Sequence, residues 1–148
     1  MIATVTAIGG LLGLIASLIF LAVQTRAVSE QLRMAANVSG TTGLDQCLNN
    51  LRDVYFKMME YPGLRKYFYD EVPCPEAEIE RERVLLLAEA LADVLETGLM
   101  TTRRIAGTES FEDWRDYCCY ILDHSPTLRG LVGEHPAWWP DLRQLMEA

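Results

Sequence analysis

Positive charge, histidine and catalytic motifs are all scarce in this sequence. Its 148 residues contain 13 lysines and arginines against 21 acidic residues, and the net charge of −8 argues against a generic nucleic-acid-binding protein. There are only 2 histidines. No phosphate-binding loop, dinucleotide-binding glycine motif, G-x-S-x-G or HExxH pattern occurs. The sequence therefore points to no particular reaction, and we expect no cofactor or metal.

Long apolar runs are also scarce, and only one is long enough to cross a bilayer. This excludes a multi-pass membrane protein. Residues 1–23 contain no charged side chain, and the first one is Arg26. As a helix this segment is about 35 Å long, against about 30 Å for the hydrocarbon core. A cleaved signal peptide is the alternative. No lysine or arginine precedes the run, however, and it is longer than a signal-peptide core. We therefore expect residues 1–23 to be an uncleaved span in contact with membrane lipid.

The charges that follow the span predict its orientation. Arg26 and Arg33 lie on its C-terminal side, and no lysine or arginine lies on the other. Since positive charge accumulates on the cytoplasmic side, we expect the rest of the chain to face the cytoplasm. The 4 cysteines are compatible with a reducing compartment, where they would be small buried thiols. An outward-facing domain on an inverted anchor remains the alternative, and it would allow disulfides.

Small residues recur every four positions within the span, at Gly9, Gly13 and Ser17. Such a stripe lets two helix backbones approach closely, so it is a candidate surface for self-association in the membrane. The alternative is that glycine is simply common in membrane helices.

The rest of the chain divides into a juxtamembrane helix and hinge, residues 24–40, and an all-helical soluble domain, residues 41–148. Glycine, serine and threonine over residues 37–43 predict a loop, either a hinge or a kink in one long helix. Apolar residues at intervals of three and four predict an amphipathic helix from Leu44 to about Tyr61. Proline and glycine follow it directly, which ends the helix.

The clearest predicted helix begins at Pro75, which suits a first helical position, and continues to Arg104. Further helices are expected over residues 110–124, from Ser125–Pro126, and over residues 141–146. No segment alternates with the period of a strand. The sequence therefore predicts an all-α protein: one N-terminal transmembrane helix followed by a compact bundle of about five or six helices.

Several short motifs in this domain are similar to those of a known family. They are Leu64–Tyr69, Leu91–Glu96, Trp114, Ser125–Arg129 and His135–Pro140. Together, over about residues 44–146, they resemble a widespread family of uncharacterised small bacterial proteins that carry a membrane anchor and a helical domain. The resemblance implies a bacterial inner membrane location and an all-α fold, and it implies no activity.

Three carboxylates, Glu89, Asp93 and Glu96, share one face of the long predicted helix. Helical di-metal sites also use a histidine three residues after a glutamate, and none is present here. We therefore predict structural ion pairs, with Arg65 and Arg129 among the candidate partners, since an unpaired buried charge is costly.

Adjacent tryptophans, Trp138 and Trp139, lie in a turn framed by prolines. One hypothesis is that one ring closes the core and the other remains exposed, where it would suit a protein interface or a lipid headgroup region; the favoured alternative is that both rings close the helical core. With Tyr67 and Tyr69 they are the candidate interaction surface; the alternative is that these rings only pack.

These observations favour a single-pass membrane-anchored interaction or scaffold module. It would self-associate as a homo-oligomer or bind a protein partner as an accessory subunit of a membrane assembly. The less favoured hypothesis is an enzyme or small-ligand sensor of unknown class. It would require Glu89, Asp93, Glu96, His124 and Arg65 to converge in one cavity.

Overall fold

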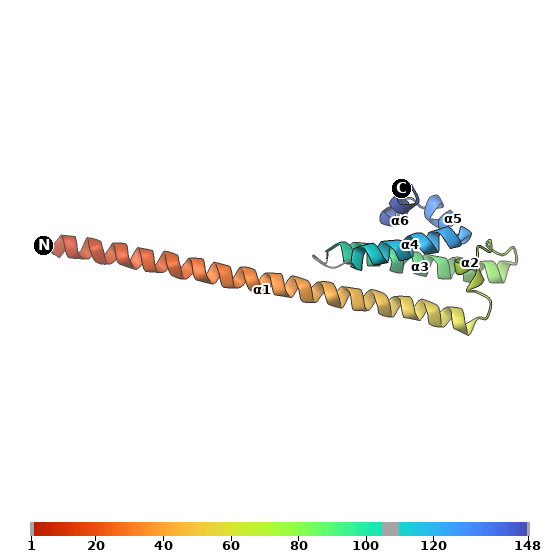
Figure 1. Cartoon of the computed structure of the whole chain (residues 1–148), viewed down its shortest axis with the longest axis horizontal. Coiled ribbons are helices and arrows are strands. Elements are labelled where there is room, and N and C mark those ends of the chain that lie inside the picture. Colours follow the sequence, from red (N-terminus) through yellow and green to blue (C-terminus); the bar gives the residue numbers. More distant parts are fainter. Residues whose placement is uncertain (1, 105–109, 148) are drawn as a thin grey trace. The chain divides into compact units, whose positions relative to one another are not determined.

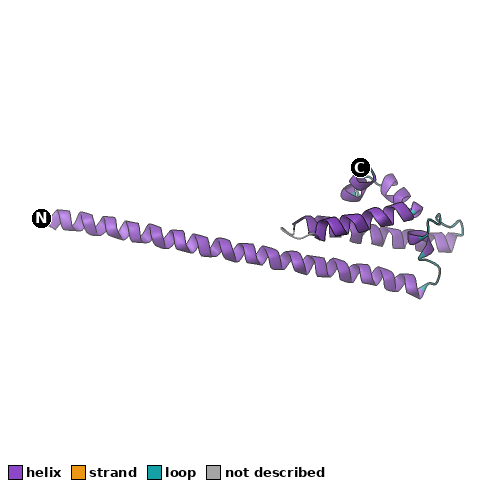
Figure 2. Ribbon diagram, viewed as in Figure 1, coloured by secondary structure: helices purple, strands orange, loops and turns teal. Residues whose placement is uncertain are grey.

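In the computed structural model the described part of the chain is helical, and residues 2–104 and 110–147 are described (Figures 1 and 2). The side chains of residues 2–12, 16, 36–41, 104 and 110 are not included in that description. No strand occurs among the described residues, so the prediction of an all-α fold is confirmed. The chain forms two compact units, Met1–Ser39 and Gly40–Ala148, which are described separately.

The first unit is the N-terminal part of helix α1, whose full extent is Ile2–Glu60. Within it Gly13–Ala35 is long and apolar enough to cross a membrane. The predicted span, residues 1–23, begins among residues whose side chains are not described. The Oγ of Ser17 donates a hydrogen bond to the Gly13 carbonyl at 2.9 Å, so this hydroxyl is satisfied within its own helix. Such internal bonding suits an apolar environment, where a polar group without a partner is costly.

The prediction of a hinge loop over residues 37–43 is wrong, because α1 is helical through this stretch; of the two readings, the structure agrees with one long helix. Glycine in a helix costs only about 1 kcal/mol relative to alanine, and no proline is present to remove a backbone hydrogen bond. The division between the two units nevertheless falls inside this stretch, at Ser39 and Gly40.

The second unit contains the end of α1 and five further helices. These are α2 (Lys66–Tyr69), α3 (Glu78–Arg104), α4 (Ser110–His124), α5 (Pro126–Glu134) and α6 (Pro140–Met146).

Local sequence explains most of these helix boundaries. Helix α1 ends before Pro62, and Gly63 has a φ of +96°, which glycine adopts without strain. The hydroxyl of Ser125 accepts a hydrogen bond from the Leu128 N–H and caps α5, as its sequence predicts. Pro75, in contrast, lies outside α3, because that helix begins three residues later, at Glu78.

Helix α3 is the centre of the second unit and packs against α4, α5 and α6. Its core face includes Val84, Leu91, Leu95 and Leu99, which are almost completely buried. The core continues onto α1 through four buried residues at helical spacing: Cys47, Leu51, Val54 and Met58. The C-terminal third of α1 is therefore part of the same core as the helices that follow it.

One close contact determines how α3 and α4 pack. The indole of Trp114, on α4, lies directly over Gly98, so that a Cβ atom built on Gly98 would overlap the ring. The Trp114 Nε1–H donates a hydrogen bond to the Leu95 carbonyl at 3.0 Å. Because Gly98 has no side chain, a large ring fits between the two helices at this point.

Candidate interaction surface

Two hollows meet at Tyr55 on the surface of the second unit, and we refer to them together as the groove. The first has a volume of about 400 Å³ and lies between α1 and α4. Its lining is mainly apolar and aromatic: Leu44, Leu48, Leu51, Tyr55, Asp113, Trp114 and Tyr117. The second has a volume of about 410 Å³ and lies between α1 and α2, with lining residues Tyr55, Met58, Met59, Arg65 and Tyr69. The groove thus follows α1 from Leu44 to Met59.

Three tyrosines join the two hollows, and we name Tyr55, Tyr69 and Tyr117 the tyrosine cluster. The hydroxyls of Tyr55 and Tyr117 are 2.6 Å apart, and those of Tyr69 and Tyr117 are 3.1 Å apart. The Tyr69 hydroxyl also donates to Tyr55 at 3.3 Å. The cluster connects α1, α2 and α4 by hydrogen bonds at the middle of the groove.

Two members of the tyrosine cluster, Tyr69 and Tyr117, remain protonated at physiological pH. Burial raises the pKa of both Tyr69 and Tyr117 well above the ordinary value for a phenol, and hydrogen bonds within the cluster raise that of Tyr117 further. Tyr69 and Tyr117 therefore present neutral phenol groups at the middle of the groove.

Opposite charges mark the two ends of the groove. Asp113 lines the first hollow, and it takes part in no ion pair of the described residues. Arg65 lines the second hollow, where its guanidinium carbon lies 4.4 Å from the centre of the Tyr69 ring. Arg65 also forms an exposed ion pair with Asp70 at 3.4 Å.

Exposed apolar side chains lie along the same stretch of α1. Leu48 and Met59 line the hollows and are 41% and 66% exposed. Phe56, on the same helix, is 49% exposed. An amphipathic helix that packed only onto its own domain would present polar residues at such positions.

The four aromatic residues that the sequence suggests as a surface do not share one. Tyr67 is buried, and its hydroxyl donates to Glu80 at 2.8 Å. Trp139 is buried as well, whereas Trp138 is 57% exposed and stacks on His135 with ring centres 4.0 Å apart. Only Tyr69 belongs to the groove. Tyr67 and Trp139 lie in the core because helix packing needs large apolar side chains, and each satisfies its polar atom internally.

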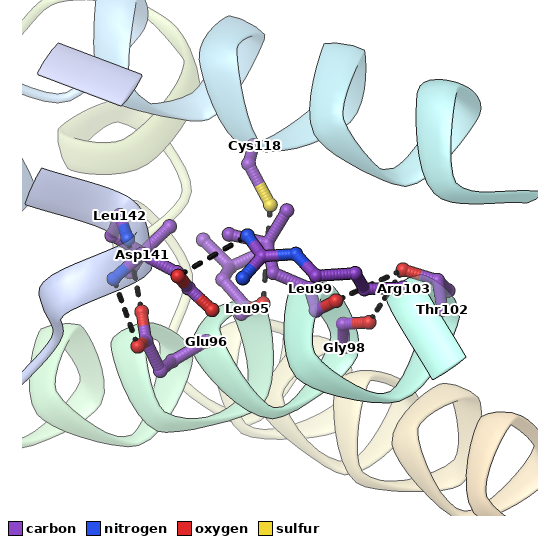
Figure 3. Close-up of polar contacts among 9 residues, drawn as sticks. All are labelled: Leu95, Glu96, Gly98, Leu99, Thr102, Arg103, Cys118, Asp141 and Leu142. Atoms are coloured by element: carbon purple, nitrogen blue, oxygen red, sulfur yellow. Dashed lines mark hydrogen bonds and ion pairs between the residues drawn. The ribbon is translucent and has the colours of Figure 1, made fainter. Parts of the chain in front are cut away.

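The carboxylates predicted to form ion pairs instead hold helix α6. Glu96 is buried, and its oxygens accept hydrogen bonds from the backbone N–H groups of Asp141 and Leu142 at 3.0 and 2.9 Å (Figure 3). The start of a helix offers unpaired N–H groups and a positive dipole end, so a buried carboxylate is satisfied there. Asp93 accepts a hydrogen bond from the Trp139 indole N–H at 2.8 Å. The predicted ion pairs of these carboxylates with Arg65 or Arg129 are therefore not formed.

The arginines form ion pairs elsewhere. Arg129 lies 3.8 Å from Asp123, and Arg65 pairs with Asp70 as described above. Arg103, at the end of α3, lies 3.2 Å from Asp141 and adds a second connection between α3 and α6 (Figure 3). Glu89, the third carboxylate, lines a separate hollow on α3. Sequence spacing alone places these acids on one face, but only the packing of α6 selects their partners.

The residues of the enzyme hypothesis lie in different surroundings. Glu89 and Arg65 line separate hollows, and the Glu96 carboxylate is hydrogen-bonded to the backbone of α6. The Nδ1 of His124 is 2.8 Å from the Tyr120 carbonyl, one turn earlier in its own helix. In the described part of the chain, no three histidine, cysteine or acidic side chains are placed to hold a metal ion.

The small-residue stripe of the first unit is described only in part. The surroundings of Gly9 lie outside the described residues. At Gly13, nothing lies within 4 Å of the position that a Cβ would occupy, so this face of the helix is open.

The comparisons with known proteins found no matching family model, curated protein or solved structure for this chain. Leu48 and Tyr55 have the spacing of an ordinary buried helix face, so the amino-acid sequence gives no sign that they and Met59 line surface hollows. Their exposure depends on how far α4 and α2 extend over α1.

Proposed function

We propose that this chain is a single-pass membrane-anchored helical module that binds a helix of a protein partner in the groove. Residues 1–23 would anchor it in a bacterial plasma membrane, with the second unit facing the cytoplasm. One helix near the N terminus is long and apolar enough for this role. Arg26 and Arg33 favour the orientation.

The observation that carries the proposal is the groove, with its two apolar hollows joined at Tyr55. From Leu44 to Met59 the α1 backbone advances about 22 Å, which equals about four turns of a partner helix. Binding of this kind places apolar anchors of one helix face into successive hollows. Exposed Leu48 and Met59 would then be covered by the partner.

The charges at the two ends favour one direction for the bound helix. A helix has a partial positive charge at its N terminus and a partial negative charge at its C terminus. Asp113 would therefore attract the N terminus, and Arg65 the C terminus. Because Asp113 lies near Leu44 and Arg65 near Met59, the partner helix would run parallel to this part of α1.

Photo-crosslinking of the full-length chain in native membranes tests this proposal. A photoreactive amino acid at Leu48 or Met59 should form one discrete adduct, while the same probe at exposed Glu134, on α5, should not. A further Tyr55→Glu substitution should abolish the adduct at Leu48. The mass of the adduct shows whether the helix comes from another protein or a second copy of this chain. Equal crosslinking at all three positions, or none at the groove, would contradict the proposal.

Extraction with alkaline carbonate tests the anchor separately. The full-length chain should remain in the membrane pellet, and a variant without residues 1–36 should move to the supernatant and stay helical. If the full-length chain is extracted as readily as the truncated one, the membrane anchor is wrong.

A further inference from the structure

Helix α3 carries a second exposed apolar surface, formed around Ile79 and Leu86. These residues are two turns apart and are 68% and 59% exposed. Leu86 lies where two hollows meet. The larger one, of about 680 Å³, is lined by Glu76, Glu78, Arg81, Glu82, Leu85, Leu86 and Glu89. The smaller one, of about 270 Å³, is lined by Lys57, Tyr61, Leu64, Arg83, Leu86 and Leu87. We name this surface the α3 face.

The uncompensated charge of the α3 face is negative. Four glutamates and one arginine line the larger hollow, and none of the four glutamates takes part in an ion pair of the described residues. In the smaller hollow, Lys57 pairs with Glu60 at 2.8 Å, whereas Arg83, whose guanidinium lies 4.9 Å from the centre of the Tyr61 ring, keeps its positive charge. Four glutamates thus lie beside two arginines, Arg81 and Arg83, and the balance remains negative.

The helix dipole explains only part of this acidity. Glu78 lies in the first turn of α3, where a negative charge is stabilised by the helix N terminus. Glu82 and Glu89 lie beyond that turn, and the dipole effect falls off within it. These two carboxylates flank exposed Leu86 on the same helix, so they combine with it into a surface that is both apolar and acidic.

A surface that is both apolar and acidic favours some binding partners over others. An anionic lipid surface and a second copy of the same face both bring negative charge, and both are repelled. A helix with apolar residues on one side and lysines or arginines beside them complements the face in both respects. Membrane proteins carry such basic residues in the cytoplasmic segments next to their spans.

We propose that the α3 face binds a basic amphipathic segment that adjoins the membrane span of another membrane protein. For its location, this inference rests on the proposed function, which holds the second unit on the cytoplasmic side. The length available is also defined. From Ile79 to Glu89 the helix advances about 15 Å, or about three turns. Beyond it, Asp93 accepts a hydrogen bond from Trp139, the residue that precedes α6, and this contact limits the face at that end.

Binding of model peptides to the full-length chain tests the inference. The chain is reconstituted in nanodiscs of zwitterionic phosphatidylcholine, so that the lipid does not attract a basic peptide. The probe is a fluorescent helix of about fourteen residues with leucine on one face and lysine on the other. The controls are a shuffled peptide of the same composition and a peptide with glutamate in place of lysine. Only the amphipathic basic peptide should bind, and its affinity should fall as salt is raised.

Substitutions at exposed positions locate the binding site without disturbing the core. The double variant Glu82→Gln/Glu89→Gln should raise the Kd about fivefold and reduce its dependence on salt, as expected for two lost exposed ion pairs. Leu86→Ser should raise the Kd by a similar factor or more. Leu48→Glu, in the groove, is the matched control and should leave the Kd unchanged.

Two results would overturn the inference. The first is a Kd that changes with neither the double glutamate variant nor Leu86→Ser. The second is loss of peptide binding in Leu48→Glu, which would place the basic helix in the groove. Failure of the groove crosslinks with peptide binding intact would instead count against the proposed function and leave the α3 face in place.

Discussion

Replacing Gly98 by alanine should destabilise the second unit, because the added methyl group would overlap the Trp114 ring. The ring cannot withdraw easily, since it is buried and its Nε1–H is bonded to the Leu95 carbonyl. Overpacking of a core costs about 1–3 kcal/mol, and loss of the buried hydrogen bond costs about 1–3 kcal/mol more. The better helix propensity of alanine offsets about 1 kcal/mol. We therefore expect a net loss of about 3 kcal/mol.

Tryptophan fluorescence during thermal and guanidinium unfolding measures this loss. The far-ultraviolet circular dichroism signal is less suitable, because the helix of the first unit contributes to it. For a unit of this size, about 3 kcal/mol corresponds to a fall in Tm of about 15 °C. In a chain that already carries Trp114→Phe, the Gly98→Ala substitution should lower the free energy of unfolding by less than it does alone, because the two residues are in contact.

Gly130, in α5, supplies the control for this prediction. A Cβ at this position would meet nothing within 4 Å, so Gly130→Ala should gain about 0.5–1 kcal/mol from helix propensity alone. If Gly98→Ala is as stable as Gly130→Ala, the inferred packing of α3 against α4 is wrong.

Three further predictions concern polar and titratable groups. Glu96→Gln should lower the free energy of unfolding by about 1–2 kcal/mol, because a neutral amide accepts the α6 N–H groups less strongly; hydrogen exchange should show α6 loosened first. Stability should fall above about pH 10, where the unfolded phenols ionise but those of Tyr69 and Tyr117, whose pKa is raised by burial, remain protonated. Denaturation midpoints at pH 9 and pH 11 should differ less in Tyr117→Phe. Burial also raises the pKa of the Cys118 thiol, so a thiol reagent should modify Cys119 well before it; equal rates would contradict the burial of Cys118.

The helices themselves were largely predictable from the sequence. Their apolar spacing and the prolines that end or begin them are local signals, and α4, α5 and α6 lie where those signals place them. The stretch around Gly40 shows the limit of such signals. Its composition favours a loop, but no proline interrupts the backbone hydrogen bonds, and α1 continues through it.

The candidate surfaces were far less predictable. Trp139 and Tyr67 were candidates for exposure, yet both are buried, while Leu48 and Leu86 resemble core residues and are exposed. Periodicity identifies the faces of a helix but does not say which of them a neighbouring helix will cover. The partners of Glu96 were missed for the same reason, because they belong to the backbone of a helix 45 residues further along the chain.

The amino-acid sequence by itself determined the apolar N-terminal helix, the all-α class, the acidic balance and the approximate helix boundaries. These properties depend on composition and on residues within a few turns of one another. Only the tertiary structure decided that three tyrosines from α1, α2 and α4 meet, that Glu96 holds α6, and that Gly98 admits Trp114. The physical reason is that each of these contacts joins residues distant in sequence, and packing the core brings them together.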